Sequence, residues 1–231
     1  MVAIMKIKAK NTLHGVIMKI LLINGSTKNN GSCDFLLNYA KSELEARGIS
    51  ASRFDAGAAP RCACTSCGAC KNGGGCVIRD IDELAVMAGE ADGLAIFTPT
   101  FYGSASGNLL SILSRLCISS GGKLRYKPIT VIGVGRRGCV SEAIHSVTRF
   151  FEFLSCPIIF GSYPAIVYAK DRKAAEYDAE GLQNLRESLK SLVWLTEVCS
   201  FGAKNNIAPP ALEARIRTDI SNLHEKFNYL A

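Results

Sequence analysis

The chain has 231 residues, of which 48% are hydrophobic, so it can form one domain with a sizeable core, with or without an appendage. A core of this size needs no disulfide bonds, which disfavours a disulfide scaffold. The formal net charge of +7 is compatible with nucleic-acid binding, but Lys and Arg are spread along the chain without a stripe of aromatic and basic residues. We therefore expect no nucleic-acid partner, and either a solvated basic surface or attraction to an acidic protein.

The first residues resemble neither a signal peptide nor a membrane anchor. The stretch MVAIMKIKAKNTLHGVIMK is interrupted by three lysines, and no apolar run approaches the roughly 18 residues of a membrane span. We expect a cytoplasmic protein without a membrane partner. In that compartment thiols stay reduced, and clustered cysteines usually serve metal or redox chemistry. Residues 1–17 are interpreted as an N-terminal extension.

From Lys19 onward, short apolar runs typical of buried strands alternate with helical patterns. Strands are expected at 19–24 (KILLIN), 50–56, 92–100 and 129–135, and helices at 33–48, 80–91, 104–117, 140–154 and 178–199. The helix at 80–91 is expected to have Asp80 or Asp82 as its N-cap. Such alternation predicts βαβ units with right-handed crossovers and a parallel sheet covered on both faces.

With about five strands, the expected fold is a flavodoxin-like, doubly wound α/β domain with strand order 2-1-3-4-5. Its ligand crevice would lie at the carboxyl ends of strands 1 and 3. We assign residues 18–204 to this domain, with a cysteine loop at 62–76 after strand 2. Residues 205–231 are interpreted as a C-terminal helical appendage. Its apolar positions recur at three- and four-residue spacing and would pack on the domain itself or on a partner subunit: Leu212, Ile216, Ile220, Leu223 and Phe227.

The loop NGSTKNNGSCD after the first strand offers an anion site. Backbone amides, Lys28 and the hydroxyls of Ser26, Thr27 and Ser32 stand at the N-terminus of a predicted helix. The loop is neither a GxGxxG dinucleotide motif nor a Walker loop, so a single phosphate, and hence a mononucleotide, is favoured. An ordinary polar loop is the alternative.

Two further loops are expected at the same sheet edge. TPTFYG, residues 98–103, follows the third strand and offers aromatic side chains, and a glycine-rich turn at 133–138 follows the fourth. A phosphate site, an aromatic slot and a glycine loop together favour flavin mononucleotide (FMN).

The segment RCACTSCGACKNGGGC holds five of the ten cysteines. Cys64, Cys67, Cys70 and Cys76 form C-x2-C-x2-C-x5-C, a tight spacing that favours a four-iron four-sulfur (4Fe-4S) cluster. Structural zinc usually takes two C-x2-C pairs separated by a longer loop, and the segment could also bind no metal. Cys62 is surplus.

The remaining cysteines and the histidines suggest no catalytic group. Cys117, Cys156 and Cys199 lie in apolar surroundings and are expected in the core. No Ser-His-Asp or paired-carboxylate pattern appears around the three histidines, so we predict no catalytic side chain. This is consistent with an enzyme whose cofactor performs the chemistry.

Over residues 18 to about 200 the chain resembles the NADPH-dependent FMN reductase group of flavodoxin-like proteins and, within it, the iron-sulfur flavoproteins of anaerobic microbes. The resemblance rests on KILLINGSTKNNGSCDFLL, CTSCGACKNGGGCVIRDID, ADGLAIFTPTFYGSASGNLLSILSR and GVGRRGCVSEA. It implies three sets of FMN contacts. The phosphate would be held by Ser26, Lys28, Ser32 and Cys33. The ring would face Thr98, Pro99, Thr100, Phe101, Tyr102 and Gly103. Its other flank would be covered by Gly135, Arg136 and Gly138.

Some positions depart from the group's pattern. Cys33 stands where Thr is usual. Leu110 and Ser114 replace a Lys and an Asp, although Arg115 is retained, and Gly138-Cys139 replaces paired glycines.

The resulting expectation is an FMN-dependent oxidoreductase that passes electrons between a one-electron donor such as ferredoxin, a 4Fe-4S cluster and FMN, and delivers them to a small-molecule acceptor. A homodimer or homotetramer is expected from the resemblance. One alternative is a cluster-free reductase of FMN or quinones that uses NAD(P)H. Another is a non-catalytic redox or metal sensor.

Overall fold

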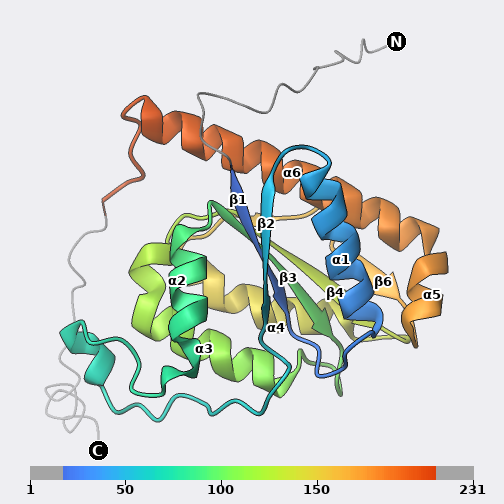
Figure 1. Ribbon diagram of the computed structural model, residues 1–231, viewed down its shortest axis with the longest axis horizontal. Coiled ribbons are helices and arrows are strands. Elements are labelled where there is room, and N and C mark those ends of the chain that lie inside the picture. The colour runs from blue at the N-terminus through green and yellow to red at the C-terminus, as the bar shows by residue number, and fades with distance from the viewer. Residues whose placement is uncertain (1–17, 212–231) are drawn as a thin grey trace, which may run out of the picture.

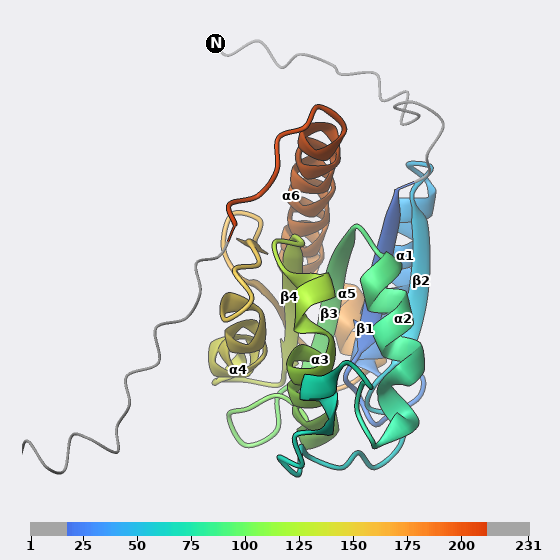
Figure 2. The ribbon, with the colours of Figure 1, turned by 90° about the vertical axis from the view of Figure 1, so that its left-hand side faces the viewer.

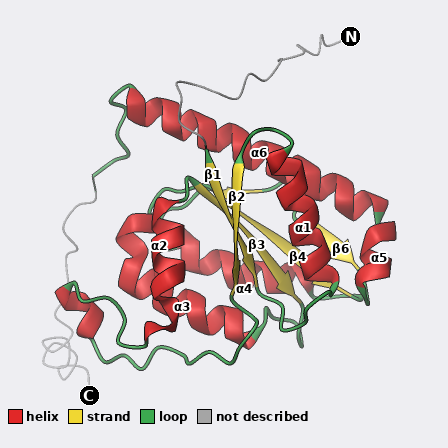
Figure 3. Cartoon of the chain, viewed as in Figure 1, coloured by secondary structure: helices red, strands yellow, loops and turns green. Residues whose placement is uncertain are grey.

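The computed structural model describes residues 18–211, and the predicted extension and most of the predicted C-terminal appendage lie outside them. Six strands are present: β1 Lys19–Asn24, β2 Ser50–Asp55, β3 Gly93–Pro99, β4 Ile129–Gly135, β5 Ile158–Ile159 and β6 Ala165–Tyr168. The α-helices are α1 Ser32–Glu45, α2 Asp82–Glu90, α3 Gly107–Leu124, α4 Val140–Glu152, α5 Arg172–Tyr177 and α6 Ala179–Lys204. Two short 3-10 helices, η1 Ala69–Asn72 and η2 Arg79–Ile81, lie in the cysteine segment and after it (Figure 3).

All strand pairs are parallel and run in the order β2-β1-β3-β4-β5, which confirms the flavodoxin-like topology. Two short strands share the edge of β4: β5 pairs with its first two residues, and β6 pairs with its later residues. Pro164, which cannot donate a ladder hydrogen bond, stands directly before β6.

Helices cover both faces of the sheet (Figures 1 and 2). Apolar side chains of α2, α3 and α4 form one buried cluster against the sheet, and those of α1, α5 and α6 form a second cluster on the opposite face. The central strands β1, β3 and β4 are therefore buried on both faces, which is why their sequences read as continuous apolar runs. Within residues 18–211, no helix combines the length and apolar character needed to cross a bilayer.

Two sequence predictions are wrong in detail. Neither Asp80 nor Asp82 caps α2, whose N-cap residue is Ile81 and has no side-chain cap. The Asp80 carboxylate is instead taken up by ion pairs with Arg61 and Arg115. Cys199 is exposed on α6, in contrast to the buried Cys156, because it lies on the helix face turned away from the sheet.

Candidate functional site

The strand-end loops and the cysteine segment lie at one edge of the sheet. The loops after β1, β3 and β4 all leave the carboxyl ends of adjacent parallel strands. The cysteine segment leaves β2 at this edge and runs along the bottom of the molecule to η1 (Figure 1). The topology therefore places the predicted FMN contacts and the predicted cluster ligands at the same edge.

The loop after β1 is held in shape by side chains at its base. Asn24 donates from Nδ2 to Asp55 Oδ1 at the end of β2, at 2.9 Å, and its Oδ1 accepts from the backbone N–H of Ser26 at 3.1 Å. The Ser26 hydroxyl in turn accepts from the backbone N–H of Lys28 at 3.1 Å. Ser26 therefore shapes the loop from within, while the Lys28 side chain is exposed at its rim.

The N-terminus of α1 leaves backbone N–H groups free to bind an anion. Its N-cap, Gly31, provides no side-chain cap, so the first N–H groups point out of the helix end without intrahelical partners. The one acidic residue of this turn, Asp34, would repel a phosphate. Its carboxylate is buried and paired with Arg53 at 2.6 Å, which offsets that repulsion.

Cys33 belongs to the core more than to the loop. Its side chain is 2% exposed and packs among the apolar residues between α1 and the sheet. Burial raises the pKa of the thiol to about 12, with the neighbouring Asp34 charge adding to the effect, so the thiol stays protonated. What Cys33 can offer to a phosphate is its backbone N–H.

The predicted ring contacts divide into buried and exposed groups. Thr98 is fully buried, and its hydroxyl donates to the Pro99 carbonyl at 3.0 Å. Phe101 and Tyr102 are exposed, and with Gly103 and Ser104 they form a two-residue hairpin in which Tyr102 and Gly103 have positive φ. The flat aromatic area at this edge is thus presented by a tight turn, for which Gly103 is suited.

The loop after β4 lies against the loop after β3. A Cβ at Gly135 would stand 2.5 Å from Val140 Cγ2 and 3.2 Å from the Thr100 hydroxyl, so glycine allows this close approach. Beyond it, Arg136 and Gly138 are exposed at the edge. Cys139, which sequence reasoning treated only as a departure from a glycine pair, is exposed beside Gly103, with positive φ at the N-cap of α4.

Together these groups fit a bound FMN. Free backbone N–H groups, Lys28 and half-buried Ser32 suit a phosphate, and the exposed hairpin and the Gly135 loop offer two flanks for a flat ring. The loops predicted to contact the phosphate and the ring follow the adjacent strands β1 and β3, where the switch point of a doubly wound sheet lies.

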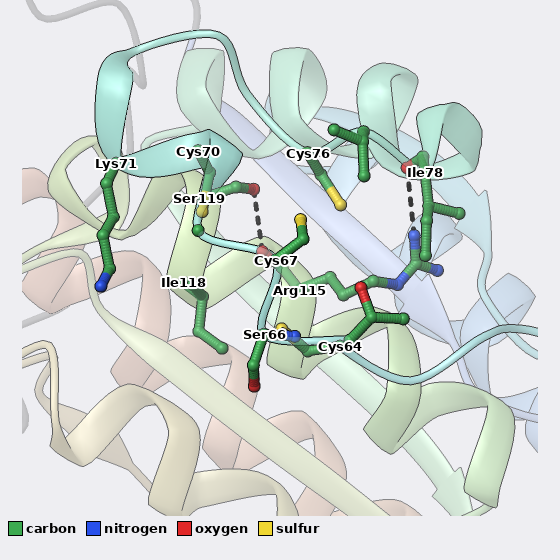
Figure 4. A pocket seen from close by; sticks show the side chains of 13 residues that line it. Cys64, Ser66, Cys67, Cys70, Lys71, Cys76, Ile78, Arg115, Ile118 and Ser119 are labelled. Carbon is green, nitrogen blue, oxygen red and sulfur yellow. Dashed lines mark hydrogen bonds between the residues drawn. The ribbon is translucent and has the colours of Figure 1, made fainter.

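The four predicted cluster ligands line one cavity of about 220 Å³ (Figure 4). The cavity is bounded by the cysteine segment on one side and by α3 on the other, through Arg115, Ile118 and Ser119. All four thiols are free, whereas Cys62 is exposed and does not line the cavity.

No group of three or more His, Cys, Asp or Glu within residues 18–211 is arranged to hold a single metal ion. A tetrahedral zinc with Zn–S bonds of about 2.3 Å would require sulfurs roughly 3.8 Å apart. The thiolates of a 4Fe-4S cluster bind four different irons and stand farther apart, around a larger volume. The common cavity therefore suits a cluster better than a single ion.

Ion pairs that the sequence did not reveal connect the two ends of this segment to each other and to α3. Arg115 is 1% exposed and donates to Asp80 through Nη1 at 2.5 Å and Nη2 at 3.0 Å, and to the Ile78 carbonyl at 3.1 Å. Arg61, just before the first cysteine, reaches the same Asp80 at 3.2 Å. The pKa of the Asp80 carboxyl is held below its usual range, first by the Arg115 hydrogen bond, against partial burial, and further by Arg61.

Comparisons with known proteins agree with this arrangement. The model of the family described as NADPH-dependent FMN reductase matches residues 18–171. An iron-sulfur flavoprotein of Methanocaldococcus jannaschii is 31% identical over 186 residues, covering 74% of this chain and 93% of the relative. An iron-sulfur flavoprotein of Methanosarcina thermophila is 25% identical, covering 78% of this chain and 96% of its own length.

Among solved structures, an NADH:FMN oxidoreductase in its apo form superposes with a TM-score of 0.59 at 16% identity, covering 77% of this chain and 89% of that one. A flavodoxin, described as WrbA-like, from Agrobacterium tumefaciens has a TM-score of 0.56 at 11% identity, covering 79% and 99%. These likenesses show the fold. The match over residues 18–171 establishes that the chain belongs to the NADPH-dependent FMN reductase family of flavin-dependent oxidoreductases.

Proposed function

We propose that this oxidoreductase carries a 4Fe-4S cluster on Cys64, Cys67, Cys70 and Cys76, and that it passes electrons between a one-electron donor, the cluster and FMN. A ferredoxin-like donor and a small-molecule acceptor are the proposed partners, in a homodimer or homotetramer. The observation that carries the proposal is the cavity of about 220 Å³ lined by all four of these cysteines and closed by α3.

The residues present fit such a cluster. Three of the four ligands are spaced at C-x2-C-x2-C around the αL residue Gly68 and η1, and the fourth follows Gly73 and Gly75, which also have positive φ. These backbone conformations turn the segment back on itself, so that Cys76 lines the same cavity as Cys64. The relatives named iron-sulfur flavoproteins give independent support.

When bound, FMN would supply two-electron chemistry and the cluster one-electron chemistry, which suits a protein that connects one-electron donors to two-electron acceptors. The chain's own part is to bind and orient. The N-terminus of α1, with Lys28 and Ser32, would anchor the phosphate, and the hairpin at 101–104 and the Gly135 loop would fix the ring.

The test is anaerobic purification followed by determination of iron, acid-labile sulfide and FMN and by a visible spectrum. About four irons and four sulfides per FMN, with broad absorbance that is lost in Cys67→Ser, is the expected result. Cys62→Ser is the matched control, because Cys62 lies in the same segment but does not line the cavity, and it should retain the iron. Absence of iron in the unaltered protein would refute the proposal.

The second candidate is a cluster-free reductase of FMN or quinones that uses NAD(P)H. It is favoured by the family to which the chain belongs. Rapid oxidation of NADPH by iron-free protein would support it, and reduction of the flavin by ferredoxin alone would count against it.

A further inference from the structure

The cavity wall contains a buried cation. Arg115 projects from α3, is 1% exposed, and lines the same cavity as the four cysteines (Figure 4). A buried guanidinium is costly unless it is paired, and here it is paired on one side only, with Asp80 and the Ile78 carbonyl.

One nitrogen of this side chain, Nε, has no hydrogen-bond partner among residues 18–211. Arg115 Nε is also buried. A buried donor left in this way has lost its hydration without gaining a hydrogen bond in exchange. Such a group on the wall of a sulfur-lined cavity is suited to an acceptor that occupies the cavity.

Arg115 shares the cavity with one of the proposed ligands in particular. Arg115 and Cys76 both line it, from α3 and from the end of the cysteine segment (Figure 4). A cation and a thiolate that share one cavity wall influence each other electrostatically.

We infer that Arg115 is a positioning residue that sets the reduction potential of the cluster, by presenting a positive charge and its Nε–H to the sulfurs of the cavity. The inference rests on the proposed function. One-electron reduction, with the electron supplied by the external one-electron donor, adds one negative charge to the cysteine-bound cluster. A buried cation and a hydrogen bond to sulfur favour that reduced form and so raise the potential.

Asp80 should act in the opposite direction. Its carboxylate neutralises part of the Arg115 charge, so its removal leaves a stronger positive field at the cavity. Arg61 provides the matched control, because it pairs with the same Asp80 oxygen as Arg115 Nη2 and bears the same charge, but does not line the cavity.

The experiment is a redox titration monitored by electron paramagnetic resonance on anaerobically purified full-length protein, with iron and sulfide determined for each sample. Arg115→Gln should lower the midpoint potential by at least about 59 mV, which corresponds to a tenfold change in the one-electron equilibrium constant. Arg115→Lys should shift it less, Asp80→Asn should raise it, and Arg61→Gln should shift it by less than half the Arg115→Gln value.

An unchanged potential in Arg115→Gln, or an equal shift in Arg61→Gln, would overturn the inference. If Arg115→Gln does not fold, Asp80→Asn decides alone, since a fall or no change in its potential contradicts the electrostatic role. A merely structural role would lower the iron content of these variants without potential shifts of opposite sign. Absence of iron from the unaltered protein would instead refute the proposed function, and the inference with it.

Discussion

Asp80, in η2 just after the cysteine segment, and Arg115 on α3 form a two-bond ion pair, with Nη1 to Oδ1 at 2.5 Å and Nη2 to Oδ2 at 3.0 Å. Arg61, at the start of the segment, donates to the same carboxylate. One aspartate thus joins the two ends of residues 61–80 to each other and to the domain. This arrangement explains how a segment rich in glycine and alanine keeps four cysteines around one cavity.

Removing the Asp80 carboxylate should destabilise the fold. Asp80→Ala leaves the buried Arg115 guanidinium without its counter-ion, and loss of one member of a fully buried pair costs about 3–5 kcal/mol. Because the Asp80 side chain is 30% exposed, we expect a smaller loss of about 1–3 kcal/mol in the free energy of unfolding, measured by urea denaturation. Asp82→Ala is the control, since Asp82 and Arg79 form an exposed pair, and it should change the free energy by less than about 0.5 kcal/mol. Equal effects of the two substitutions would contradict the conclusion that the Asp80–Arg115 pair stabilises the fold.

The same carboxylate should give a pH dependence. The pKa of folded Asp80 is depressed, first by the Arg115 hydrogen bond, so its stabilisation is complete above the unfolded pKa of about 3.9 and is lost as pH falls toward the folded value. The difference in free energy of unfolding between unaltered protein and Asp80→Asn should therefore be constant from about pH 7 to pH 5 and shrink below about pH 4. Urea titrations at several pH values measure it, and a difference independent of pH would exclude the ionised pair as its source.

Ser32 and Cys33 should differ in their effect on FMN binding. Ser32 is half-buried at the start of α1, and loss of a hydrogen bond to a charged phosphate costs about 1.5–3 kcal/mol, so Ser32→Ala should weaken FMN binding roughly 10- to 100-fold. The thiol of Cys33 faces the core, so Cys33→Ala should leave the dissociation constant within about threefold while lowering the unfolding free energy by about 1 kcal/mol. Quenching of flavin fluorescence measures both constants. A large loss of affinity in Cys33→Ala would show that the thiol does contact the phosphate.

Gly135 should not tolerate a side chain. A Cβ there would stand 2.5 Å from Val140 Cγ2, so Gly135→Ala should displace the loop after β4, cost about 1–3 kcal/mol of stability and weaken FMN binding. Gly122→Ala is the control, because Gly122 lies on the exposed face of α3 and a Cβ there meets nothing within 4 Å; it should be neutral or stabilise by up to about 1 kcal/mol. Thermal unfolding and flavin titration compare the two variants. Similar behaviour of both would mean that the Gly135 loop relaxes without cost.

The sequence alone determined the fold and the kinds of groups at the site. Continuous apolar runs such as KILLIN are typical of strands that are buried on both faces, and their alternation with helical patterns predicts a parallel sheet. The topology of that sheet then fixes which loops share an edge. The cysteine spacing likewise predicted four residues that do line one cavity. These features depend on local periodicity and on short-range spacing, which a sequence displays directly.

Only the tertiary structure decided which side chains face the site. The one-residue step from Ser32 to Cys33 turns the side chain from the loop into the core, and loop sequence does not specify that rotation. Asp80 has the sequence context of a helix cap, yet it pairs with Arg61 and with Arg115, 35 residues farther along the chain. The pairing of such distant charges depends on how α3 packs against the cysteine segment, because an ion pair is set by proximity in space and not by position in the chain.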